Sequence, residues 1–396
     1  MTALPTSKRR NMALLVGAIV LTLSVWFAGT AAVPALLAEG LISPSRAAWL
    51  TACVQLGFVF GTLLSAVFSL ADRWPARWLF LGCALLAAAA TLAQTLVAPA
   101  GDMALLLRFI AGAAMAGVYP VGMKLAASWA KEDLGLLIGL VVGAVTLGSA
   151  LPHALPALVG VLDWRVAYAG AGLLAGLGGL LILGFQPGPL LGARPPFRPA
   201  QMLEAWRNKG LRLANLGYLG HMWELYAMWA WIGVFLAAVL ESPAIGPWVF
   251  AVVAAGALGC ILAGLAADRW NRAKVAGVCM LASGTCALLI GPASAWPILA
   301  LGIAFIWGLT VVADSAQFSA CIVSLSPPDY VGTMLTVQTS LGFLLTAGTI
   351  WALPRAMEML GMSAGFALLG IGPLLGAIAM WRLAPLLPRT GAAKGR

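Results

Sequence analysis

Twelve apolar runs, each about as long as a membrane is thick, constrain the fold of this chain more than any other feature. They lie at about residues 12–37, 47–70, 78–98, 103–129, 134–160, 164–186, 213–240, 245–267, 275–292, 296–325, 333–354 and 362–381. About 20 apolar residues in a helix cross the hydrocarbon core of a bilayer, where only helices and closed barrels satisfy their backbone hydrogen bonds. Because 62% of the 396 residues are hydrophobic and only 9% are charged, the chain lacks the polar surface of a soluble protein. We therefore expect an all-α polytopic membrane protein with 12 transmembrane helices, and we exclude a nucleic-acid-binding protein despite the net charge of +10.

The distribution of basic residues predicts the orientation of these spans. Of the 23 Lys and Arg residues, only Arg46, Arg165 and Arg355 fall in the loops of one side, and only Arg108 and Lys124 fall inside spans. The loops of the other side and the two chain ends carry the rest. Since cytoplasmic loops are enriched in Lys and Arg, we expect both ends of the chain to lie in the cytoplasm.

The chain contains an internal repeat with an offset of 196 residues. The sequence Ala-Asp-Arg-Trp at Ala71–Trp74 recurs at Ala267–Trp270. At the same offset, a further set of identical residues recurs: Phe109, Ile110, Gly112 and Asp133 as Phe305, Ile306, Gly308 and Asp329. Two repeats related by an axis along the membrane normal are typical of transporters whose halves rock. We predict an N-terminal six-helix bundle at 1–186, a cytoplasmic basic linker at 187–212 and a C-terminal six-helix bundle with a short cytoplasmic tail at 213–396.

The repeated loops resemble the signature of the major facilitator superfamily, which reads roughly Gly-x-Leu-Ala-Asp-Arg-x-Gly-Arg between its second and third helices. The first copy keeps Leu70–Arg73, and the second keeps Gly264, Asp268, Arg269 and Arg272. The family's glycines are replaced at Phe68, Pro75 and Asn271. Arg108 followed by Gly112 is similar to the family signature of helix 4, and residues 328–333 are similar to its loop after helix 10. The resemblance covers the whole chain and implies two pseudo-symmetric bundles, with helices 1, 4, 7 and 10 lining a central cavity.

The resemblance is less specific for the substrate. Gly148–Pro152 departs from the Gly-Pro-x-x-Gly-Gly ending that drug exporters carry on helix 5. The second and eighth spans also lack the mid-membrane Arg of nitrate porters. The overall character of the sequence is loosely similar to that of the cyanate-permease-type branch of the superfamily.

The seventh span carries the richest set of ionisable residues. His221 and Glu224 are three residues apart, which places both on one face of a helix. A carboxylate removed from water binds a proton more readily, and a nearby imidazole can relay that proton. We predict that this pair takes part in proton coupling or substrate contact. The alternative is a Glu–His hydrogen bond that fastens the helix to a neighbour.

The tenth span carries a polar stripe at helical spacing, formed by Thr310, Asp314, Gln317 and Cys321. Such a stripe within apolar sequence is expected to face the cavity or a polar group of another helix. Asp314 is therefore a second candidate for the proton site, and Gln317 is a candidate substrate contact. The alternative is a structural salt bridge from Asp314 to Arg108 or Lys124.

Three other ionisable residues lie within spans. The resemblance implies that Arg108 handles protons or substrate, although near the end of its helix it can instead extend to the interface. Lys124 lies about 160° around an ideal helix from Arg108, so we expect only one of them to face the cavity. His153, between two prolines, is expected to be a packing residue with its hydrogen bonds satisfied.

Charged residues at the ends of the second and eighth spans predict a gate. Asp72 and Asp268 are expected at cytoplasmic helix ends, where a carboxylate interacts favourably with the N-terminus of a partner helix. Arg73, Arg269 and Arg272 complete the two copies of the motif. Such contacts close the cytoplasmic side and break when the halves rock. The alternative is a pair of solvated turns that only serve topology.

Together these features predict a secondary active transporter of a small polar or anionic solute, coupled to protons. The sequence contains neither an ATP-binding motif nor a catalytic constellation, so we expect an ion gradient as the energy source and no enzyme activity. The alternatives are an efflux-type proton antiporter for organic compounds and, with less support, a non-transporting membrane sensor.

The six Cys and two His form no metal-binding pattern, so we expect no metal or other cofactor. The expected partners are a small-molecule substrate, H⁺ and the lipid bilayer of the plasma (inner) membrane, with the protein as a monomer.

Overall fold

Twelve helical spans form the fold. The computed structural model describes residues 8–387 apart from 131–132, 161–162, 192–196 and 243, without the side chains of Asp72, Leu134 and Pro328. Within this part of the chain, 12 spans are long and apolar enough to cross a membrane. The first six spans are α1 (Lys8–Leu23) with α2 (Ala28–Ala38), α3 (Pro44–Phe68), α5 (Ala76–Ala93), α6 (Asp102–Met115) with α7 (Tyr119–Ala127), α8 (Leu134–Val159) and α9 (Trp164–Leu181). The last six are α11 (Lys209–Val239), α12 (Gly246–Arg269), α13 (Arg272–Ile290), α14 (Pro297–Val311) with α15 (Ser315–Leu325), α16 (Val331–Leu360), and α17 (Met362–Leu368) with α18 (Ile371–Leu383). The all-α fold and the number of spans predicted from the sequence are confirmed.

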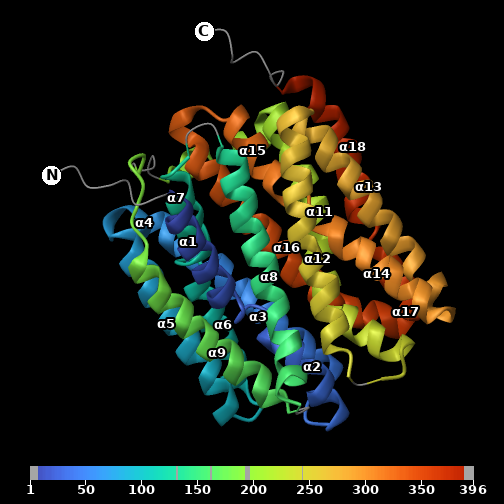
Figure 1. Cartoon of the computed structure of the whole chain (residues 1–396). Helices are drawn as coiled ribbons and strands as arrows, with labels where there is room; N and C mark the ends of the chain where they lie inside the picture. Colours follow the sequence, from blue (N-terminus) through green and yellow to red (C-terminus); the bar gives the residue numbers. More distant parts are fainter. Residues whose placement is uncertain (1–7, 131–132, 161–162, 192–196, 243, 388–396) are drawn as a thin grey trace.

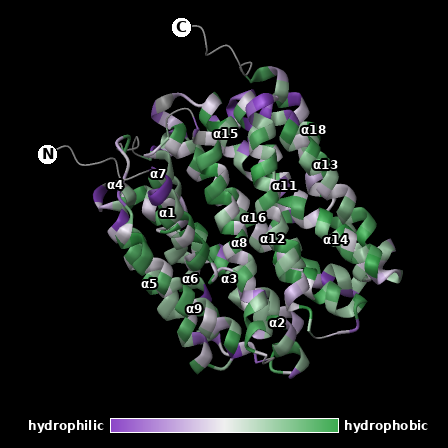
Figure 2. Cartoon of the chain, viewed as in Figure 1, coloured by the Kyte–Doolittle hydropathy of each residue, from purple (hydrophilic) through white to green (hydrophobic). Residues whose placement is uncertain are grey.

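The spans are arranged as two groups that meet along two seams. In Figure 1, helices α1 to α9 (blue to green) lie on one side and α11 to α18 (yellow to red) on the other. Helix α8 packs against α12, and α3 packs against α16. Helix α1 begins and α18 ends at the same end of the bundle, which we call the terminal end; the opposite end is the distal end. Apolar residues dominate the middle of the bundle, and hydrophilic residues gather toward its ends (Figure 2), as expected for a protein surrounded by lipid.

Interruptions of the spans place polar backbone groups at membrane depth. The first span is interrupted at residues 24–27, between α1 and α2, and α2 continues through Pro34. The fourth span is interrupted at 116–118, just before Pro120, because proline supplies no N–H and fits the first turn of a helix. The tenth span is interrupted at 312–314, and this position is the repeat of 116–118.

Matching close contacts within the two groups support the internal repeat. A Cβ atom added at Gly112 of α6 would lie 2.0 Å from the carbonyl oxygen of Val54 in α3. A Cβ atom added at Gly308 of α14 would lie 1.9 Å from the carbonyl oxygen of Val252 in α12. Glycine is needed at both places because the helix backbones touch. On this basis we propose two similar halves, at 1–186 and 213–396, joined by the linker.

Candidate functional site

His221 and Asp314 form the centre of a buried polar cluster. His221 lies in the middle of α11, and Asp314 lies at the interruption between α14 and α15. The Nδ1 atom of His221 is 2.8 Å from the Oδ1 atom of Asp314, and both side chains are buried. A hydrogen bond of 2.8 Å joins His221 Nε2 to the hydroxyl of Ser315. Each ring nitrogen therefore has a polar atom of another residue within 2.8 Å.

Glu224 lies one helical turn from His221 but has a separate set of partners. The hydroxyl of Ser283 in α13 donates to Oε2 at 2.8 Å, and the indole N–H of Trp307 in α14 donates to Oε1 at 2.7 Å. Glu224 is 1% exposed, and no ion pair joins it to a described residue. The structure thus places His221 with Asp314 and Glu224 with two neutral donors. The alternative of a Glu224–His221 hydrogen bond finds no support in this arrangement.

Arg108 is fully buried and hydrogen-bonds to the backbone where the first span is interrupted. Its guanidinium donates to the carbonyl oxygens of Leu50 at 3.1 Å, Val25 at 2.9 Å and Trp26 at 2.6 Å. Five N–H groups in a rigid fork suit this multiple contact. Arg108 therefore does not extend to the interface, and it binds backbone oxygens rather than Asp314.

Lys124 is engaged at another place. Its ammonium group donates to the carbonyl oxygen of Ala71 at 2.9 Å, next to the short helix α4 (Leu70–Arg73). Neither Lys124 nor Arg108 pairs with Asp314, so the alternative of a structural salt bridge from Asp314 to one of them finds no support. Asp314 has His221 as its partner instead.

The predicted stripe on the tenth span is divided by the interruption. Thr310 lies in the last turn of α14, where its hydroxyl donates to the carbonyl oxygen of Ile306. Gln317 and Cys321 lie in α15 and are both buried. Residues on the two sides of a break no longer follow one helical phase, so Thr310 does not join Asp314.

A cluster of six buried aromatic residues closes the middle of the bundle between the two groups of helices. This central aromatic cluster consists of Trp26, Phe27 and Phe58 from one side and Tyr226, Trp229 and Phe343 from the other. Ring centroids across the seam are 5.8 Å apart for Phe27–Tyr226, 5.5 Å for Trp26–Phe343 and 4.5 Å for Phe58–Phe343. Sequence reasoning missed the cluster; its only signal is that each residue lies near the middle of its span.

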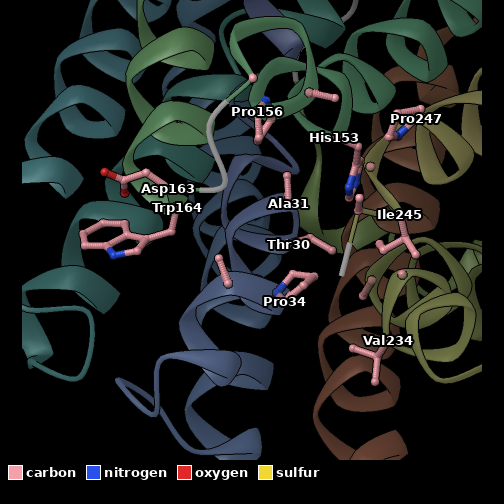
Figure 3. A pocket seen from close by; sticks show the side chains of 17 residues that line it. Thr30, Ala31, Pro34, His153, Pro156, Asp163, Trp164, Val234, Ile245 and Pro247 are labelled. Carbon is pink, nitrogen blue, oxygen red and sulfur yellow. The ribbon is translucent and has the colours of Figure 1, made fainter. Parts of the chain in front are cut away.

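A cavity of about 290 Å³ lies on the distal side of the central aromatic cluster. Figure 3 shows Thr30, Ala31 and Pro34 of α2 on one side and Ile245 and Pro247, at the start of α12, on the other. His153 of α8 lies between these two groups of residues.

The structure corrects the expectation for this histidine. The Nε2 atom of His153 is buried and has no hydrogen-bond partner among the described residues. His153 is therefore not a satisfied packing residue. Burial between two prolines suggested packing, and the sequence alone gives no sign of a cavity at this position.

The predicted gate residues lie at the terminal end. Asp268, in the last turn of α12, lies next to the first turn of α8: a Cβ atom added at Gly135 would be 3.2 Å from Oδ1 of Asp268. Arg73 and Arg269 are exposed, and Arg272 begins α13. The side chain of Asp72 lies outside the described residues. The carboxylate of Asp268 is thus positioned beside the N-terminus of a helix from the other half, as the gate requires.

Comparisons with known proteins agree with this architecture. A sequence model of the Major Facilitator Superfamily matches residues 14–352, whereas no curated protein sequence matches the chain. The fold is similar to that of the proton:xylose symporter XylE (TM-score 0.73, 13% identity, covering 96% of this chain and 97% of that one). It is also similar to the nucleoside transporter NupG (0.71, 14%, 94% and 99%) and the human organic anion transporter MFSD10 (0.70, 19%, 95% and 100%). At these identities the likeness shows the fold alone. The chain belongs to the Major Facilitator Superfamily and is a multi-pass membrane protein with the fold of secondary transporters.

Proposed function

We propose that this protein is a proton-coupled secondary transporter of a small polar solute, with alternating access by rocking of its two halves. The observation that carries the proposal is the burial of Glu224, His221 and Asp314 at membrane depth within one half. Ionisable groups there are costly and mark proton or substrate pathways. The similar structures include a proton:xylose symporter and a nucleoside transporter, which supports the same function. From the bias of basic residues, we place the protein in the inner membrane with both ends in the cytoplasm.

The surroundings of Glu224 suit a group that gains and loses a proton. When Glu224 is ionised, the Ser283 hydroxyl donates to its Oε2 atom. When Oε2 carries a proton, it can donate to Ser283 Oγ, whose own proton then turns to the carbonyl oxygen of Met280 at 3.2 Å. Trp307 donates to Oε1 in both states. Each carboxyl oxygen of Glu224 therefore has a hydrogen-bond partner in both protonation states.

An uncharged solute has more structural support than an anionic one. Arg108 and Lys124 are the buried Lys and Arg among the described residues, and both donate to backbone carbonyl oxygens. An anion entering between the halves would have to compete with these contacts. The anionic class remains the second candidate because one similar structure is that of an organic anion transporter.

Rocking of the halves is supported by the contacts that this state makes. The central aromatic cluster closes the middle, while the cavity beside His153 lies on the distal side. Asp268 contacts the start of α8 at the terminal end. This state is therefore closed toward the terminal end, and transport requires the Asp268 contact and the aromatic contacts to break.

The test is proton movement in proteoliposomes that contain trapped pyranine. D-xylose, uridine, benzoate and para-cresol are added in turn, and the direction of the pH change separates symport from antiport. For the solute that moves protons, Glu224→Gln is expected to abolish gradient-driven accumulation and to leave solute counterflow measurable. Asp314→Asn is expected to weaken binding as well. Glu358→Gln, at an exposed carboxylate of α16, is the matched control. A wild-type response to the pH gradient in Glu224→Gln would refute its role in coupling.

A further inference from the structure

The distal cavity contains one polar side chain whose hydrogen-bonding capacity is unused. His153 is 7% exposed, and its Nε2 atom has no partner among the described residues. Leaving such an atom unpaired costs about 1–3 kcal/mol. The backbone fixes this position, because a Cβ atom added at Gly246 of α12 would lie 2.3 Å from the carbonyl oxygen of His153. The α8–α12 seam therefore holds the imidazole at the cavity wall.

Of the other polar side chains that line the cavity, Thr30 and Asp163 have partners, whereas the indole N–H of Trp164 has none among the described residues but lies apart from His153 (Figure 3). The hydroxyl of Thr30 is 3.1 Å from the hydroxyl of Thr51. The Oδ1 atom of Asp163 accepts from the backbone N–H of Arg165 at 2.8 Å, and Figure 3 shows Asp163 and Trp164 apart from His153. The described lining includes no Lys or Arg, and most of it is Ala, Pro, Val and Ile. Beside the imidazole of His153, the cavity thus offers a mostly apolar lining, with no other free polar side chain nearby among the described residues.

We propose that this cavity binds a compact, uncharged, mostly apolar solute with a single hydroxyl, which makes its hydrogen bond to the imidazole of His153. A hydroxyl both donates and accepts, so it suits either tautomer of the imidazole. The volume of about 290 Å³ equals roughly ten water molecules at ~30 Å³ each, which fits a solute with on the order of ten non-hydrogen atoms. An anionic solute would lose its hydration without gaining a counter-ion. The carboxylate of the lining, Asp163, lies apart from His153 and is paired with Arg165. This binding does not require transport, so the proposal stands independently of the proposed function.

The chain has only two histidines, His153 and His221, so nitrogen NMR of the imidazoles reads the site directly. The protein, labelled with ¹⁵N-histidine, is titrated in lipid nanodiscs with para-cresol. The ring signal of His153 is assigned as the one that disappears in His153→Phe. We expect a saturable shift of the His153 signal and none of the His221 signal, which serves as an internal control for partitioning into lipid.

Three further titrations test the separate parts of the proposal. The compound para-xylene, which lacks the hydroxyl, is expected to bind about tenfold more weakly, the equivalent of one hydrogen bond. The anion para-toluate is expected to cause no shift. Ala35→Leu, which fills the cavity without touching the imidazole's chemistry, is expected to remove the response to para-cresol.

Each opposite result overturns the assignment. An unchanged His153 signal refutes the site, an equal response to para-xylene refutes the hydrogen bond, and a shift by para-toluate refutes the uncharged class. An undiminished response in Ala35→Leu places the solute elsewhere. The NMR titrations do not depend on the transport assay of Glu224→Gln. A negative result in that assay would count against the proposed function and would leave the binding site untouched.

Discussion

At the scale of single residues, buried charge is stabilised in three different ways. Arg108 is matched by backbone carbonyls at an interrupted helix, Glu224 by two neutral donors, and Asp314 by an imidazole. A backbone carbonyl that has lost its helical partner accepts strongly, so the interruption of the first span and Arg108 stabilise each other. Arg108 is therefore a structural centre of the first half in this state.

We expect Arg108→Ala to destabilise the protein by about 2–4 kcal/mol, because three buried carbonyl oxygens lose charged donors. Arg108→Lys is expected to recover only part of this, since an ammonium group cannot span all three oxygens. Thermal unfolding of the detergent-solubilised protein measures the effect. The control is Arg382→Ala, at an exposed position near the end of α18. Equal melting temperatures for the Arg108 and Arg382 variants would show that the carbonyl contacts contribute little.

At the scale of helices, the two groups share one interruption and one close helix contact at the repeat offset. The breaks at 116–118 and 312–314 share the repeat offset, and Gly112 and Gly308 each touch a backbone carbonyl of the neighbouring helix. Without a hydrophobic force between helices in lipid, such close van der Waals contacts drive association. Gly112 and Gly308 occupy equivalent positions of the repeat because each lies where two helix backbones touch.

Helix α14 offers a matched pair of glycines that tests this contact. Gly308→Ala would force α14 away from α12, and we expect a loss of about 1–3 kcal/mol from overpacking. Gly302 has nothing within 4 Å of an added Cβ atom, so Gly302→Ala is expected to be neutral or to stabilise by up to ~1 kcal/mol through helix propensity. Unfolding in a denaturing detergent compares the two. A similar loss in both variants would mean that propensity or membrane insertion, rather than the backbone contact, is responsible.

At the scale of the whole molecule, the contacts describe one state of a transport cycle. The aromatic cluster closes the middle, Asp268 lies beside the first turn of α8 at the terminal end, and the cavity beside His153 lies toward the distal end. A charge beside a helix N-terminus is worth about 0.3–1 kcal/mol. A contact of this size is strong enough to bias two states and weak enough to break in each cycle.

We therefore expect Asp268→Asn to shift the population toward the state that opens at the terminal end. A cysteine introduced at Thr30, in a background without the six native cysteines, reports this shift through its labelling by a water-soluble maleimide. Labelling is expected to slow about two- to fivefold, the equivalent of 0.3–1 kcal/mol. Glu204→Gln, at the same end in the short helix α10 (Glu204–Arg207), is the control. Unaltered labelling in Asp268→Asn would remove Asp268 from the gate.

The sequence by itself determined the fold class, the number of spans and the repeat. Hydropathy is a local property of the chain, and the thickness of the bilayer sets the length of each apolar span. It also identified His221, Glu224 and Asp314 as unusual, since ionisable side chains at membrane depth are energetically costly. Only the tertiary structure decided their partners. The break before Ser315 changes the helical phase of the tenth span, so Asp314 meets His221 while Thr310 does not. The cavity beside His153 and the aromatic cluster arise where helices distant in sequence meet, and no periodicity within one helix encodes how its neighbour is rotated.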